Sequence, residues 1–115
     1  MFENKSQKEI LEILEPIMDN CLDGSNEGDY EKHVKHFTPR LRSIVTPENL
    51  KSQLEYRPHG FFTRRELTLL VRREKSIGIV WKQFISKTND EFVNHAIFVE
   101  KNGEILIDHC LICYV

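Results

Sequence analysis

His95 and Asp108 are the residues of this sequence whose types and placement come closest to a catalytic pair. A predicted hairpin puts both on one face, one diagonal step apart, with Lys82 on a neighbouring strand. A carboxylate, an imidazole and an ammonium that converge in an apolar cavity can perform general acid–base chemistry. Asp108 would orient His95 as a base, and Lys82 would offset developing negative charge. The same groups could instead hold a ligand without chemistry, or satisfy one another as a buried structural network.

The element that positions this pair is a hairpin with Asn102-Gly103 at its corner. A type I′ turn needs positive φ at both central residues, which asparagine and glycine tolerate. A two-residue turn fixes the register of the flanking strands. It predicts that His95 lies opposite Cys110 and that Ile97 lies opposite Asp108.

Alternation along the predicted strands sorts their side chains onto two faces. Face A carries Val80, Lys82, Phe84, Val93, His95, Ile97, Val99, Leu106, Asp108, Cys110 and Ile112. Face B carries Ile79, Trp81, Gln83, Ile85, Phe92, Asn94, Ala96, Phe98, Ile105, Ile107, His109, Leu111 and Cys113. Both faces are mostly apolar, so the sheet needs two covers. The N-terminal helices supply one, and a second copy of the protein supplies the other. A strongly curled sheet that partly covers itself is the alternative.

The N-terminal half has the periodicity of helices. Apolar residues recur at helical spacing from Ser6 to Leu22, with Ser6 and Glu9 placed as a capping box. Pro16 inside this run predicts a kink or two helices that meet. A loop is expected over 23–28. Further predicted elements are a helix from Tyr30 to about Phe37 capped by Asp29, a short turn or helix after Thr38-Pro39, a helix that starts at Thr46-Pro47-Glu48, and a first strand over Phe61–Glu74.

Composition limits the function classes. A chain of 115 residues with a net charge of −2 is expected to form one domain, residues 1–115, without a bias toward nucleic acid. No apolar run reaches the ~20 residues that span a bilayer, and the first residues carry no apolar leader, so we expect no membrane contact and a cytoplasmic location.

The three cysteines are expected to be buried thiols. Cys110 and Cys113 are three apart on a strand and point to opposite faces, so they cannot chelate one metal ion together. His33 and His36 have the spacing of a helical metal pair, with two exposed histidines as the alternative. We expect no metal site and no cofactor.

Three helices followed by four meandering strands resemble the nuclear transport factor 2-like superfamily, also described as the SnoaL-like or cystatin-like α+β cone fold. Gly28-Asp29-Tyr30-Glu31 resembles the "N-G-D-Y/F-E" that opens the second helix in many members. The run from Lys101 to Cys110 resembles their final hairpin. The first helix and the hairpin are also similar to the association domain of calcium/calmodulin-dependent protein kinase II.

The resemblance implies three helices packed on a strongly curved four-stranded antiparallel sheet around a conical cavity. It makes face A the concave face, with His95 and Asp108 as the catalytic candidates. Its ligand-binding candidates are Lys82, Phe84, Ile97, Cys110 and, at the mouth, Tyr56. Face B would then form a homodimer through Trp81, Phe98, Ile107 and His109.

Two functions follow from this arrangement. The first is a homodimeric binding module for a small apolar molecule or another protein. The second is a lyase or isomerase that acts on a small hydrophobic carbonyl or hydroxyl compound, with His95 and Asp108 as acid and base.

Overall fold

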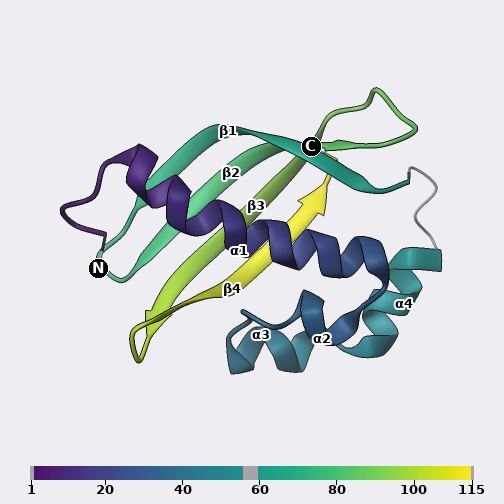
Figure 1. Ribbon diagram of the computed structural model, residues 1–115, viewed down its shortest axis with the longest axis horizontal. Coiled ribbons are helices and arrows are strands. Elements are labelled where there is room, and N and C mark those ends of the chain that lie inside the picture. Colours follow the sequence, from purple (N-terminus) through teal and green to yellow (C-terminus); the bar gives the residue numbers. More distant parts are fainter. Residues whose placement is uncertain (1, 56–59, 115) are drawn as a thin grey trace.

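A computed structural model describes residues 2–55 and 60–114 of the chain. In these residues four helices precede four strands, so the α+β class is confirmed (Figure 1). The strands form one antiparallel sheet in the order β1-β2-β3-β4. The elements are α1 (Gln7–Glu27), α2 (Tyr30–His33), α3 (Pro39–Ile44), α4 (Pro47–Glu55), β1 (Phe62–Arg72), β2 (Ser76–Ile85), β3 (Phe92–Lys101) and β4 (Glu104–Cys113).

Helix α1 is one element that runs through Pro16. The capping box at its start is confirmed, because Ser6 and Glu9 each accept a hydrogen bond from the other's backbone N–H, at 3.1 and 2.8 Å. The expected loop over 23–28 is wrong, since the helix continues to Glu27. Gly28 ends it with a φ of +71°, the left-handed conformation that suits glycine at a helix C-terminus.

The short helices start where the sequence predicts. Asp29 caps α2, Thr38 caps α3, and Thr46 accepts a hydrogen bond from the Asn49 backbone at 3.2 Å before α4. The expected helix to Phe37 ends at His33, and the segment after Thr38, expected as a short turn or a helix, is a helix. The described residues therefore hold four helices, where the resemblance implies three. Among the described residues, none of these helices is long and apolar enough to cross a membrane.

Helix α1 lies across one face of the twisted sheet, and α2, α3 and α4 gather beside its C-terminal end (Figure 1). The covered face, here called the inner face, carries Ile77, Ile79, Trp81, Ala96, Phe98 and Ile107, each at most 2% exposed. These residues pack with Ile10, Leu14 and Met18 of α1 in the hydrophobic core. The inner face therefore corresponds to face B, and face A points away from α1.

The hairpin corner is as predicted, with φ values of 53° at Asn102 and 80° at Gly103 and with Lys101 opposite Glu104. The predicted register holds from that corner only as far as the pair Phe98 and Ile107. Asp108 is then an extra residue in β4, so that Ile97 pairs with His109 and His95 pairs with Leu111. This bulge reverses the facing of the rest of β4.

The bulge is held by the segment before α3. The backbone of Ile107 accepts from Thr38 at 2.9 Å and donates to His36 at 2.7 Å. The Asp108 carboxylate accepts from the Thr38 hydroxyl at 2.8 Å and from Arg40 Nε at 3.2 Å. Thr38 is fully buried, so the contact fixes where β4 departs from regular pairing.

Candidate functional site

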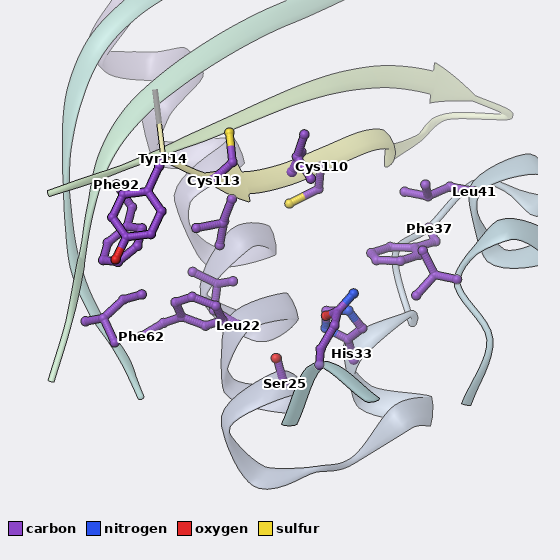
Figure 2. A pocket seen from close by; sticks show the side chains of 15 residues that line it. Leu22, Ser25, His33, Phe37, Leu41, Phe62, Phe92, Cys110, Cys113 and Tyr114 are labelled. Atoms are coloured by element: carbon purple, nitrogen blue, oxygen red, sulfur yellow. The ribbon is translucent and has the colours of Figure 1, made fainter. Parts of the chain in front are cut away.

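A hollow lined mainly by aliphatic and aromatic side chains lies between the end of α1, the three short helices and the sheet (Figure 2). Its volume is about 390 Å³. Every helix and strand sends at least one residue to it, so the cavity depends on the whole fold. It is lined by Leu22, Ser25, His33, Phe37, Leu41, Val45, Gln53, Phe62, Ile85, Phe92, Cys110, Leu111, Ile112, Cys113 and Tyr114.

His33 stands in the helical wall of this cavity, on the short helix α2. Its Nδ1 lies 2.7 Å from the carbonyl oxygen of Cys21 and 3.6 Å from the Cys21 sulfur. Because a carbonyl oxygen only accepts, Nδ1 carries a proton and donates it. Gly24 permits this approach, since a Cβ there would lie 2.4 Å from the His33 backbone nitrogen.

Cys110 brings a thiol from the sheet to the cavity. Figure 2 shows its sulfur directed toward the hollow and the sulfur of Cys113 directed away, as expected for residues three apart on a strand. A hydrogen bond with the Cys110 thiol, together with burial, raises the pKa of Cys21 well above its ordinary value. Cys21 is therefore a neutral thiol at physiological pH and a poor nucleophile.

A buried chain of amides backs the Cys110 thiol. The sulfur lies 3.7 Å from the side-chain oxygen of Asn94, and the Asn94 amide donates to Gln83 at 3.2 Å. Gln83 in turn donates to the backbone oxygens of Arg64 and Phe84. Asn94 and Gln83 are fully buried with these bonds made, so they stiffen the floor of the cavity.

The structure does not bring the predicted catalytic pair together. Asp108 is bound by Thr38 and Arg40, whereas His95 contacts His109, with 3.3 Å between Nδ1 of His95 and Nε2 of His109. Burial raises the pKa of Asp108, but the hydrogen bonds from Thr38 and Arg40 outweigh it and leave the pKa below its ordinary value. The Asp108 carboxylate thus stabilises the bulge. Neither His95 nor Asp108 lines the cavity.

The predicted ligand-binding residues separate in the same way. Lys82 pairs with Glu91 at 3.1 Å, and Phe84 lies under the Arg64 guanidinium at 3.7 Å, both on the face away from α1. Ile97 shares that face. Cys110 alone of this set lines the cavity, because the bulge turns it inward. Tyr56 lies outside the described residues.

The predicted partner surface is also wrong. Trp81, Phe98 and Ile107 are fully buried beneath α1, and the Trp81 indole donates to Glu15 at 3.1 Å. Only His109 of that set lies on the outer side of the sheet. The physical reason is that α1 covers face B, so those side chains form the core of one molecule.

Solved structures share this fold. A DUF4783 family protein from Bacteroides uniformis is 11% identical, with a TM-score of 0.54 over 84% of this chain and 95% of that chain. A SEC-C motif containing protein from Rhodopseudomonas palustris is 10% identical, with a TM-score of 0.58 over 96% of this chain and 95% of that chain. At such identities the likeness shows the fold alone. No protein-family model and no curated protein matches the chain.

Sequence reasoning missed the helical half of the cavity. His33, Phe37 and Leu41 come from the segment between α1 and α4, where the only local signals are the caps at Asp29 and Thr38. The spacing of His33 and His36 is that of a helical metal pair, but the structure separates the two side chains: His33 lines the cavity, and His36 lines another hollow with Glu104. Caps locate a short helix, yet they do not say what its side chains will face.

Proposed function

We propose that this chain is a binding module for a small apolar molecule, held in the cavity between α1, the short helices and the sheet. The observation that carries the proposal is the cavity itself. Its volume of about 390 Å³ falls in the lower part of the ~300–1,000 Å³ range of ligand pockets. Its lining is mainly aliphatic and aromatic, with a few polar groups, which is typical of such pockets.

Binding is favoured over catalysis by the state of the polar groups at the cavity. His33 already donates from Nδ1 to a backbone carbonyl. Cys21 lies behind the cavity lining, and its raised pKa keeps that thiol protonated. The acid–base pair on which a lyase or isomerase would depend, His95 and Asp108, lies away from the hollow. The ligand we expect is therefore held by apolar contact and shape.

The nuclear transport factor 2-like superfamily remains our proposal for the family. It is supported by the order of one long helix, short helices and a four-stranded meander. The Asp29 cap and the Asn102-Gly103 corner, on which the resemblance partly rests, take the local conformations expected of them. A conical shape of the sheet is part of this same proposal.

We also propose that two copies pair through the outer face of the sheet, the face away from α1. Its apolar residues include Leu69, Val80, Phe84, Val93, Ile97 and Leu111, of which Leu69 is 52% exposed and Leu111 48%. Four strands ~4.8 Å apart, each of about ten residues rising ~3.3 Å, give a footprint of about 600 Å². Two copies would bury about 1,200 Å², which is the lower limit for a specific interface.

Fluorescence titration with N-phenyl-1-naphthylamine, an apolar dye, tests the binding proposal. Val45→Phe places a bulky ring at the cavity wall and should weaken dye binding at least tenfold, whereas Val80→Phe makes the same change on the outer face and should leave it unchanged. Thermal unfolding followed by circular dichroism verifies that both variants fold. Equal affinities for the wild type and Val45→Phe, or no saturable binding by the wild type, would contradict the proposal.

A further inference from the structure

Two histidines face each other on the outer face of the sheet. Nδ1 of His95 and Nε2 of His109 are 3.3 Å apart, and the ring centroids are 4.8 Å apart at a 44° tilt. They meet because the bulge at Asp108 turns His109 outward beside Ile97, one diagonal step from His95. Both side chains are half-buried among the apolar residues of that face.

The separation of the two nitrogens matches the spacing of ligands on one metal ion. Zinc lies ~2.0–2.1 Å from an imidazole nitrogen and prefers tetrahedral geometry. Two nitrogens at that bond length and a tetrahedral angle are about 3.3 Å apart. Imidazole also suits cobalt, nickel and copper, whereas calcium and magnesium prefer oxygen.

We propose that His95 and His109 form half of a transition-metal site, which the same two residues of a second copy complete. The inference rests on the proposed pairing through the outer face. Over residues 2–55 and 60–114, no group of three or more His, Cys, Asp or Glu side chains could hold a metal ion, so one copy supplies only two ligands. Two copies supply four imidazoles, which is a full tetrahedral set.

The dimensions of stacked sheets allow such a site. Packed sheets lie ~10 Å apart, so their midplane is about 5 Å above each sheet, within the reach of an imidazole. A two-fold axis that brings identical faces together lies in this midplane and can pass over both histidine pairs. The ion would then sit between the sheets, screened from water by the apolar residues around it.

The surrounding cations are neutralised. Arg40 is bound to Asp108 at 3.2 Å, and Lys82 is bound to Glu91 at 3.1 Å. Without metal, one imidazole donates its N–H to the other across the 3.3 Å gap. On binding, both nitrogens give a lone pair to the ion, and the displaced proton moves to the other nitrogen of the same ring, so no net proton is released from the neutral pair.

The experiment uses the full chain, stripped with EDTA and titrated with zinc chloride. Sedimentation equilibrium gives the mass, and inductively coupled plasma mass spectrometry gives the bound zinc. We expect one zinc ion per two chains. The dissociation constant of the dimer should be at least tenfold lower with zinc than in EDTA. His95→Asn and His109→Asn should each abolish both effects. His36→Asn, which changes a histidine outside the outer face, should keep both. Cobalt should give the visible absorption of a tetrahedral site.

Each other outcome has a separate meaning. A dimer of equal strength in EDTA and in zinc, without bound metal, would overturn the metal site and leave the proposed pairing intact. A monomer at every concentration, with or without zinc, would overturn both. One zinc ion bound per monomeric chain would overturn the shared site. Circular dichroism melting curves of the variants exclude unfolding as the reason for a loss.

Discussion

Replacing Phe98 and Phe84 by alanine, one at a time, tests which face of the sheet is the core. Phe98 is fully buried and meets Trp81 edge-to-face, with ring centroids 6.4 Å apart at 85°. Phe84 is one strand away on the outer face, half-buried under the guanidinium of Arg64. The two variants make the same chemical change on opposite faces.

The structure predicts unequal losses of unfolding free energy. Truncating a fully buried phenylalanine costs about 3–5 kcal/mol, because it removes apolar contact and leaves a cavity. Phe84→Ala loses a cation–π contact of about 0.5–1 kcal/mol at an exposed site and a smaller apolar area, so we expect about 1 kcal/mol. The expected difference is about 3 kcal/mol.

Urea unfolding followed by the fluorescence of Trp81, the single tryptophan of the sequence, measures both losses. With a slope of ~1–3 kcal/mol per molar urea, Phe98→Ala should lower the midpoint by about 2 M and Phe84→Ala by about 0.5 M. The measurements use dilute protein, so that the proposed dimer dissociates and does not contribute to the stability of either variant. Equal midpoints, or a larger loss for Phe84→Ala, would refute the assignment of inner and outer faces.

Three further predictions concern the bulge, the hairpin corner and the contact between α1 and α2. Asp108→Asn should cost about 1 kcal/mol near neutral pH. Because the pKa of Asp108 is lowered in the fold, its contribution is present above the ordinary carboxyl pKa and is lost as pH falls through the folded pKa. Urea midpoints of wild type and variant should thus converge as the pH falls through the lowered pKa of Asp108. Gly103→Ala should cost about 1 kcal/mol from backbone strain alone, since a Cβ there meets nothing within 4 Å; urea unfolding measures this. Gly24→Ala should lower the melting temperature although alanine favours helix, because its Cβ would press on the His33 backbone.

Each of these has an outcome that contradicts it. If the urea midpoints of wild type and Asp108→Asn differ by the same amount across the acid range, protonation of the Asp108 carboxylate does not affect the stability of the fold. If Gly103→Ala unfolds with the same free energy as the wild type, the positive φ at this position costs alanine nothing, and the prediction is wrong. A Gly24→Ala variant more stable than wild type would show that α1 and α2 separate at little cost.

Local chemistry made part of the fold predictable. The Asn102-Gly103 corner, the Ser6 capping box and the proline at the start of α4 each follow from the conformations that single residues favour. The end of α1 was not predictable, because a polar stretch ending in Gly28 suits a loop as well as a capped helix. The choice depends on α2 packing against Gly24.

The bulge at Asp108 has no local signal, and this limited the prediction of the site. Its cause is Thr38, 70 residues earlier in the chain, which bonds to the Asp108 carboxylate. The sequence did indicate which face of the sheet points outward. Face A carries Lys82, His95 and Asp108, and the cost of burying charge places such residues outside. The resemblance instead placed face A inside the cavity, and the predicted site was built on that placement.

The extra residue in β4 also matters for anyone who aligns this chain with others of the same fold. An alignment that runs straight through Asp108 will match His109 with a core position and Cys110 with a surface position, and it will do so for every residue up to the end of the strand. A gap at Asp108 restores the correspondence. Comparisons of the last five strand residues are meaningful only with that gap in place.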